Sequence, residues 1–306
     1  MSTQTQVSGR VAKLDQPANS DVGLSLFRLG MHRLRRDSLT LLALGVVVFL
    51  VMISFLAPVI ERSLGLSYKD TDLTQQFLPI GTAGHIFGTD DLGRDQFIRL
   101  LYAGQVSLLI AFISALLSLV IGVSLGVTTG YFGGIIDDIT TWLITTLNSI
   151  PQLFLLLILS AVLSPGPLTL ILILGLLGWT GTMRLVRGET LGIREREYII
   201  GARAIGSSDW RVMFVHIVPN LFSIVIVSLA IDIGGLILVE SALSFLGLGV
   251  KPPTPTWGNM LTDASSYFNK GGHLVLMPGL LITVTVLCLY VIGDGIRDAF
   301  DPTTVE

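Results

Sequence analysis

The chain has 306 residues, of which 51% are hydrophobic and only 13% charged, against roughly 25% charged in a soluble domain. Because the apolar residues occur in long runs, this composition excludes an ordinary soluble protein and indicates a protein that crosses a membrane several times. The formal net charge of -3 is too small to indicate a nucleic-acid partner, and the single cysteine, Cys288, excludes a disulfide framework within the chain and a cysteine-rich metal site.

The N-terminal part is polar and then basic. Residues 1–25 hold few large apolar side chains, which predicts a flexible tail, and the first apolar run begins only near Leu39, so we expect no cleavable signal peptide. Four arginines, Arg28, Arg33, Arg35 and Arg36, directly precede that run. A basic cluster beside a membrane span is typical of the cytoplasmic side, and its position against the membrane disfavours a nucleic-acid arm.

Six apolar runs have about the length that crosses roughly 30 Å of hydrocarbon. They are predicted to be helices, because backbone groups in lipid must bond within their own segment. The fold class is therefore all-α, a polytopic membrane protein with six transmembrane helices. The predicted spans cover residues 39–60, 106–129, 139–163, 167–183, 219–246 and 273–293.

The distribution of Lys and Arg predicts the orientation. With the N-terminus inside, 13 of the 19 basic residues fall in cytoplasmic segments and 6 in external ones. This bias predicts that both chain termini are cytoplasmic. The external segment between the first two spans, residues 61–105, is long, and residues 96–102 are predicted to form a short interfacial helix ahead of the second span.

Small residues recur every four positions along the second predicted span. This spacing lets another helix approach closely, so the stripe is either a static packing surface or a seam that moves during a transport cycle. The stripe consists of Ser114, Ser118, Gly122, Gly126 and Gly130.

A polar stretch, residues 194–220, interrupts the apolar second half of the chain. Tyr198, Ile199, Ala202 and Ile205 are predicted to share one face of a short helix, with Arg203 away from that face. Gly206 stands where this helix should end, and Ser207 or Ser208 is suited to cap a second helix leading to Pro219. The pattern predicts a helix, a glycine break and a second helix; the plainer interpretation is an ordinary interfacial loop.

Two carboxylates fall within the fifth predicted span. A charge at the centre of a membrane helix costs roughly 2.5–3.5 kcal/mol, so Asp232 is expected to face a cavity or another helix. Glu240 lies nearer the outer end. Both are candidates for a translocation pathway, and for both, bonding or packing between helices is the alternative.

The polar stretch resembles the cytoplasmic loop of ABC-importer permeases, whose pattern is Glu-Ala-Ala, a later glycine, and Ile-x-Leu-Pro. Ala202, Gly206 and Pro219 match that pattern, whereas Ile200 stands in place of its glutamate and Gly201 in place of an alanine. His216 and Val218 replace its Ile and Leu. Three further stretches resemble the dipeptide, oligopeptide and nickel branch of this family, and particularly its C-type permease: HIFGTDDLGRDQFIRLLYAGQVSLL, ESALSFLGLGVKPPTPTWGNML and GDGIRDAFDP.

The resemblance implies a type I importer fold, with a five-helix core behind an extra N-terminal helix, in a prokaryotic inner membrane. It implies the following segments: a cytoplasmic tail, 1–25; an interfacial segment, first span and extracytoplasmic loop, 26–104; a permease core, 105–300, with coupling loop 184–219; and a cytoplasmic C-terminal tail, 301–306. Within the loop it implies contact with an ATPase through Tyr198, Ile199, Ala202, Arg203, Ile205 and Gly206.

The resemblance also implies partners: a second, B-type permease, two cytoplasmic ATPase subunits and an extracytoplasmic solute-binding protein. The solute would be a short peptide, or alternatively nickel or a glutathione-like compound. We expect no cofactor or metal on this chain, with ATP and Mg held by the ATPase subunits.

The sequence contains no G-x-x-x-x-G-K-[ST] phosphate loop and no defensible catalytic arrangement, so we expect this chain not to hydrolyse ATP. Its histidines show no metal-ligand spacing. A rival from another class is a secondary transporter driven by an ion gradient, supported by Asp232 and Glu240. A third possibility is a membrane scaffold that only recruits a cytoplasmic partner.

Overall fold

A computed structural model describes residues 26–82, 84–163 and 166–300. The two predicted tails, residues 1–25 and 301–306, lie outside the described residues. The described part is mostly helical, and its β-structure is limited to two isolated β-bridges. Its longer helices are α1 (Leu26–Leu34), α2 (Ser38–Phe55), α3 (Ala57–Leu64), α4 (Gln96–Phe132), α5 (Gly134–Asn148), α6 (Gln152–Val162), α7 (Pro167–Arg194), α8 (Glu197–Ala204), α10 (Phe222–Phe245) and α12 (Gly272–Phe300).

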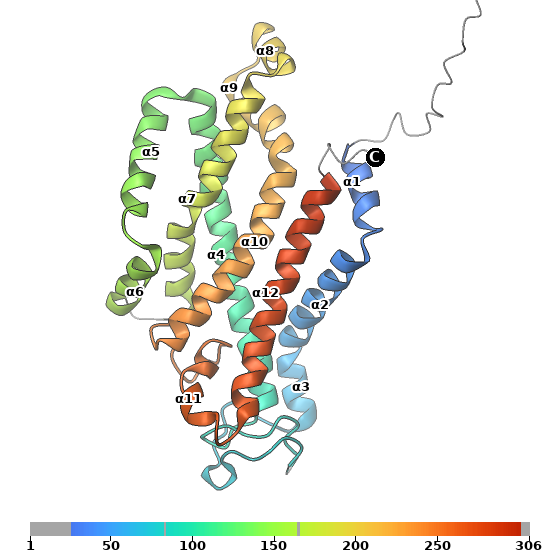
Figure 1. Ribbon diagram of the computed structural model, residues 1–306, viewed down its shortest axis with the longest axis vertical. Coiled ribbons are helices and arrows are strands. Elements are labelled where there is room, and N and C mark those ends of the chain that lie inside the picture. Colours follow the sequence, from blue (N-terminus) through green and yellow to red (C-terminus); the bar gives the residue numbers. More distant parts are fainter. Residues whose placement is uncertain (1–25, 83, 164–165, 301–306) are drawn as a thin grey trace, which may run out of the picture.

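Short helical turns lie in the segments between the longer helices. They are the 3-10 helix η1 (Leu73–Gln75), α9 (Asp209–Arg211), the π-helix η2 (Val212–Ile217), the 3-10 helices η3 (Val218–Leu221) and η4 (Asn259–Leu261), and α11 (Ala264–Tyr267). The long helices form one elongated bundle with α8 at one end and α11 at the other (Figure 1). These two ends are called the α8 end and the α11 end below.

Each of the six apolar runs is helical, as the sequence predicts. Within the described ranges, five helices are long and apolar enough to cross a membrane, and the bent pair α5–α6 makes a sixth candidate. The third predicted span is not straight: α5 and α6 meet at 79° across residues 149–151. Pro151 explains the break, because it has no backbone N–H to donate and disfavours helical geometry in the residue before it.

The second and fourth spans are longer than predicted. Residues 96–102 are not a separate interfacial helix but the first two turns of α4, whose N-terminus is capped by the Asp95 carboxylate, 2.8 Å from the Ile98 amide nitrogen. At 37 residues α4 is about 55 Å long, well beyond the hydrocarbon thickness. Helix α7 runs to Arg194 rather than ending near Met183.

Helices α4 and α7 extend together because they pack along the small-residue stripe. A Cβ atom built on Gly126 would stand 2.8 Å from the Met183 carbonyl oxygen, and one on Gly130 would stand 2.6 Å from the Thr190 Cβ. Gly122 lies equally close to Thr182, and the Ser118 hydroxyl donates to the Gly175 carbonyl at 2.9 Å. The stripe therefore fits against a helix of the same chain.

The remaining helices surround this pair. Helix α10 packs on α4 and α12, and α2 packs on α12 and α4. A buried cluster that includes Leu100, Ile237, Trp257 and Val286 lies where these helices meet. In Figure 1, α5 and α6 flank the bundle on the side opposite α2. This arrangement leaves three features that bear on function. They are a sharp turn of the chain at the α8 end, a cavity beside α10 and a pocket at the α11 end.

Candidate functional site: a helical elbow and a membrane cavity

The chain turns sharply between α8 and α9. Gly206 has φ of +85°, its amide donates to the Arg203 carbonyl at 2.9 Å, and the Ser207 amide donates to the Ala202 carbonyl at 3.0 Å. This pair of bonds ends a helix with a left-handed residue that glycine adopts without strain. Ser208, rather than Ser207, caps α9 by accepting from the Arg211 amide at 3.4 Å. The predicted helix, glycine break and second helix are all present.

The elbow is attached to the end of α4 through Tyr131. The buried Tyr131 hydroxyl donates to the Asp209 carboxylate at 2.6 Å. The Arg203 guanidinium lies over the Tyr131 ring, 4.6 Å from its centroid, where the negative face of the ring attracts the cation. Since Arg203 belongs to α8 and Asp209 to α9, both arms of the elbow contact one aromatic side chain on a membrane helix.

Arg194, the last residue of α7, binds the end of α4 as well. Its Nη1 donates to the carbonyl oxygens of Gly130 at 2.9 Å and Tyr131 at 3.3 Å. These carbonyls lie in the last turn of α4, where they lack partners within the helix, and a cation suits the negative end of the helix dipole. The ends of α4 and α7 are thus joined beneath the elbow.

The structure divides the predicted apolar face of α8. Ile199 is fully buried in a cluster with Val127, Tyr131, Val186 and Val212, so it anchors the elbow and is not exposed for docking. The expectation that Ile199 shares one docking face with Tyr198, Ala202 and Ile205 is wrong, because Ile199 packs into the buried cluster while Tyr198 and Ile205 are exposed.

Other apolar side chains of the elbow are exposed. Tyr198 is 45% exposed and Ile205 is 85% exposed, whereas Ala202 is half-buried and Arg203 is exposed beside Tyr131. Ile200 and Trp210, which the sequence pattern did not assign to this surface, are 52% and 69% exposed. We call Tyr198, Ile200, Ile205 and Trp210 the elbow surface.

Asp232 lines a cavity of about 560 Å³ bordered mainly by α7 and α10. Its carboxylate accepts hydrogen bonds from the Thr182 hydroxyl at 3.1 Å and the Ser228 hydroxyl at 3.3 Å. The bond from Thr182 joins α7 to α10, so Asp232 both links two helices and faces a cavity.

Glu240 lies elsewhere. Its side chain is fully buried and accepts from the Ser244 hydroxyl at 2.7 Å and the Ser107 hydroxyl at 3.1 Å. Ser107 also accepts from the Trp257 amide at 3.2 Å, so Glu240 joins α10 to α4 and to the loop after α10. The structure does not bring Glu240 into the cavity of Asp232, which favours the helix-packing interpretation of Glu240.

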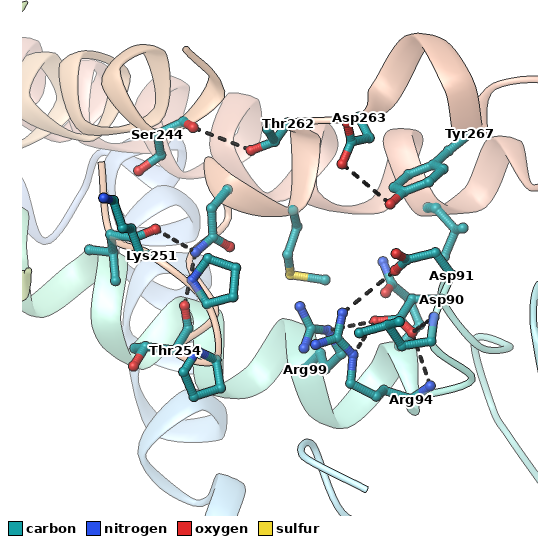
Figure 2. Close-up of a pocket in the computed structure, with 18 of the residues that line it drawn as sticks. Asp90, Asp91, Arg94, Arg99, Ser244, Lys251, Thr254, Thr262, Asp263 and Tyr267 are labelled. Carbon is teal, nitrogen blue, oxygen red and sulfur yellow. Dashed lines mark hydrogen bonds and ion pairs between the residues drawn. The ribbon is translucent and has the colours of Figure 1, made fainter. Parts of the chain in front are cut away.

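A second cavity, of about 260 Å³, opens at the α11 end. In Figure 2, Asp90, Asp91, Arg94 and Arg99 lie together on one side of it. Arg94 binds Asp90 at 2.8 Å, and the nearly buried Arg99 lies 3.1 Å from the same carboxylate. Burial and the neighbouring Asp91 raise the pKa of the Tyr267 phenol on the rim.

In the described part of the chain, no group of three or more His, Cys, Asp or Glu side chains is arranged to hold a metal ion. The fold and the elbow define a polytopic membrane transport component. The family described as "Binding-protein-dependent transport system inner membrane component" matches residues 118–306, and the family described as "N-terminal TM domain of oligopeptide transport permease C" matches residues 25–79. The chain belongs to this family of inner-membrane permease components.

Two relatives illustrate the branch. The chain is 37% identical over 281 residues to an oligopeptide transport system permease protein OppC of Escherichia coli (strain K12), covering 92% of each chain. It is 35% identical over 280 residues to a dipeptide transport system permease protein DppC of Bacillus subtilis (strain 168), covering 91% of this chain and 86% of the relative.

A solved structure supports the same fold. A chain of the inward-facing MetNI methionine ABC transporter aligns with a TM-score of 0.55 at 18% identity, covering 67% of this chain and 96% of that one. The fold is therefore that of an ABC-importer permease.

Proposed function

We propose that this chain carries short peptides across the inner membrane as one of two permease subunits of an ATP-driven importer. The observation that carries the proposal is the elbow, an exposed apolar tip fastened to α4 through Tyr131, directly beyond the ends of α4 and α7 that Arg194 joins. Relatives named as oligopeptide and dipeptide permeases support a short peptide as the transported solute. Nickel or a glutathione-like solute is the alternative within the branch.

The α8 end is the cytoplasmic end in this proposal. The Lys/Arg bias supports it, and it places the coupling loop, residues 184–219, where soluble ATPase subunits reach it. The extracytoplasmic part of 26–104 and the α11 end then face the solute-binding protein. The charged pocket around Arg94 and Arg99 is suited to docking that protein. Residues 105–300 form the core, with both tails, 1–25 and 301–306, cytoplasmic.

ATP and Mg bind the partner subunits, and this chain transmits their motion. The elbow surface lies in a groove of the ATPase, in the manner of a helix bound by its apolar face. Because α4 and α7 are locked along the glycine stripe, a displacement of the elbow moves both helices together. Asp232 faces the pathway between the two permeases, where alternating access exposes it to either side.

An ion-gradient-driven transporter is the rival. Such proteins pair broken helices in matching halves, whereas the described residues contain one bent pair, α5–α6, and no counterpart in the other half. The elbow also has no role in that mechanism.

The experiment is dipeptide uptake into proteoliposomes that hold the two permeases and two ATPase subunits. We expect uptake that requires ATP on the cytoplasmic face and peptide-loaded binding protein on the opposite face. Uptake driven by a proton or sodium gradient without ATP would reject the proposal in favour of the rival.

A further inference from the structure

The cavity of Asp232 is polar for a site at membrane depth. Side chains of α4, α5, α6, α7, α10 and α12 contribute to its wall, and its volume of about 560 Å³ falls in the range of small-molecule sites. Its polar lining includes Asn148, Gln152, Thr180, Arg184, Asp232 and Tyr290.

Two opposite charges line this cavity without neutralising one another. Within the described residues, the Arg184 guanidinium is exposed and forms no ion pair or hydrogen bond, and Asp232 bonds only to the hydroxyls of Thr182 and Ser228. Arg184 on α7 and Asp232 on α10 both line this one cavity. Asp232 lies in the middle of a membrane helix, where an ionisable residue is costly and marks a solute pathway when it faces a cavity, whereas Arg184 lines the part of the cavity nearer the α8 end.

The break between α5 and α6 supports a water-filled cavity. Backbone outside helices at membrane depth occurs where it is buried in protein or lines an aqueous cavity. Here Asn148 and Gln152, the residues on either side of the break, both line the cavity and are both exposed.

We propose that this cavity is a binding subsite for the two charged ends of a short zwitterionic peptide. The Asp232 carboxylate receives the N-terminal ammonium group, and the Arg184 guanidinium receives the C-terminal carboxylate. The inference rests on the proposed peptide transport and adds the recognition chemistry. It also gives a role to the absence of an ion pair between Asp232 and Arg184 in the described residues, since such a pair would leave neither charge free for the solute.

The test measures equilibrium binding of a radiolabelled alanyl dipeptide to the complete membrane complex in the absence of binding protein, so that only the membrane subunits select. The N-acetylated dipeptide and the C-terminal amide are the competing ligands. Because charge-assisted hydrogen bonds are strong, we expect the wild type to bind the free dipeptide about ten- to a hundredfold more tightly than either blocked form.

Two variants test the contributions of the two charges one at a time. Asp232→Asn keeps an oxygen that accepts from Thr182 and Ser228 but removes the charge, so the preference for free over N-acetylated dipeptide is expected to disappear. Arg184→Gln is expected to remove only the preference over the amide. Asp138→Asn and Arg62→Gln, which change exposed charges outside the cavity, are the matched controls and keep both preferences.

The proposal is overturned if the wild type binds the three ligands equally or not at all, whether or not the variants assemble. It is also overturned if Asp232→Asn keeps the preference for the free N-terminus. ATP-driven uptake by the wild type alongside such a result would leave the proposed function intact. Absence of that uptake would reject the function itself.

Discussion

Tyr131 connects both arms of the elbow to α4 through its hydroxyl and its ring. Tyr131→Phe removes the hydrogen bond to Asp209 and keeps the ring under Arg203. A hydrogen bond to a charged group is worth about 1.5–3 kcal/mol, so we expect stimulation of ATP hydrolysis by loaded binding protein to fall about tenfold or more while the ATPase subunits stay bound.

Tyr68→Phe, in the loop after α3 and far from the elbow surface, is the matched control for that measurement, because the Tyr68 hydroxyl has no hydrogen-bond partner among the described residues. Equal stimulated hydrolysis in Tyr131→Phe and wild type would show that the elbow does not act through this contact.

Gly206 is the second residue whose change is expected to act locally. Its φ of +85° is a left-handed conformation that a β-branched side chain rarely adopts. Gly206→Val should reach the membrane, retain the second permease and lose the ATPase subunits in a pull-down. Gly201→Val adds the same side chain in α8, where the space for a Cβ is open and φ is ordinary, and should lose little. Normal ATPase retention by Gly206→Val would contradict the elbow geometry.

At the scale of elements, the transmission of motion depends on the α4–α7 seam. Gly126→Leu places a bulky side chain where a Cβ alone already stands 2.8 Å from Val186, and overpacking costs about 1–3 kcal/mol or more. We expect the variant to insert into the membrane but fail to co-purify with the second permease. Gly188→Leu, at an exposed position of α7 with open space, is the control. Normal assembly and transport by Gly126→Leu would contradict the claim that α4 and α7 must pack closely along the small-residue stripe.

The sequence predicts which segments are helical better than it predicts where the helices end or break. Apolar length identifies each candidate membrane span of the described residues, and the spacing of Gly122, Gly126 and Gly130 predicts a close helix neighbour without saying which one. The end of α7 could not be predicted from hydropathy, because its last turns are held by Arg194 on the α4 carbonyls, a contact between residues more than sixty positions apart. Pro151 was visible, but its apolar surroundings suggested one continuous span.

The candidate site was predictable only in part. Gly206 carries a local signal, whereas the contact of Tyr131 with Asp209 and the meeting of Arg184 with Asp232 in one cavity arise from tertiary packing. Glu240 shows the same limit: its charge suggested a pathway, and its burial between α4 and α10 places it in the packing.

For the whole molecule, the orientation is directly testable. Single cysteines in a Cys288→Ser background are treated with an impermeant thiol reagent in intact cells. We expect labelling at Gly81→Cys and Pro253→Cys, which lie at the α11 end, and none at Ser207→Cys until the cells are opened. External labelling of Ser207→Cys would show that the bundle has the opposite orientation, with the elbow on the side of the membrane that the ATPase cannot reach.

The central claim is that the elbow surface holds the ATPase. The measurement that tests it most directly is a pull-down of the ATPase subunits with Ile205→Asp, because Ile205 is the most exposed apolar side chain of the elbow surface, at 85%. Leu73→Asp, at the α11 end and 64% exposed, is the control. We predict that Ile205→Asp loses the ATPase subunits and ATP-driven uptake while Leu73→Asp keeps the ATPase subunits. Full retention and normal uptake with Ile205→Asp would contradict the account.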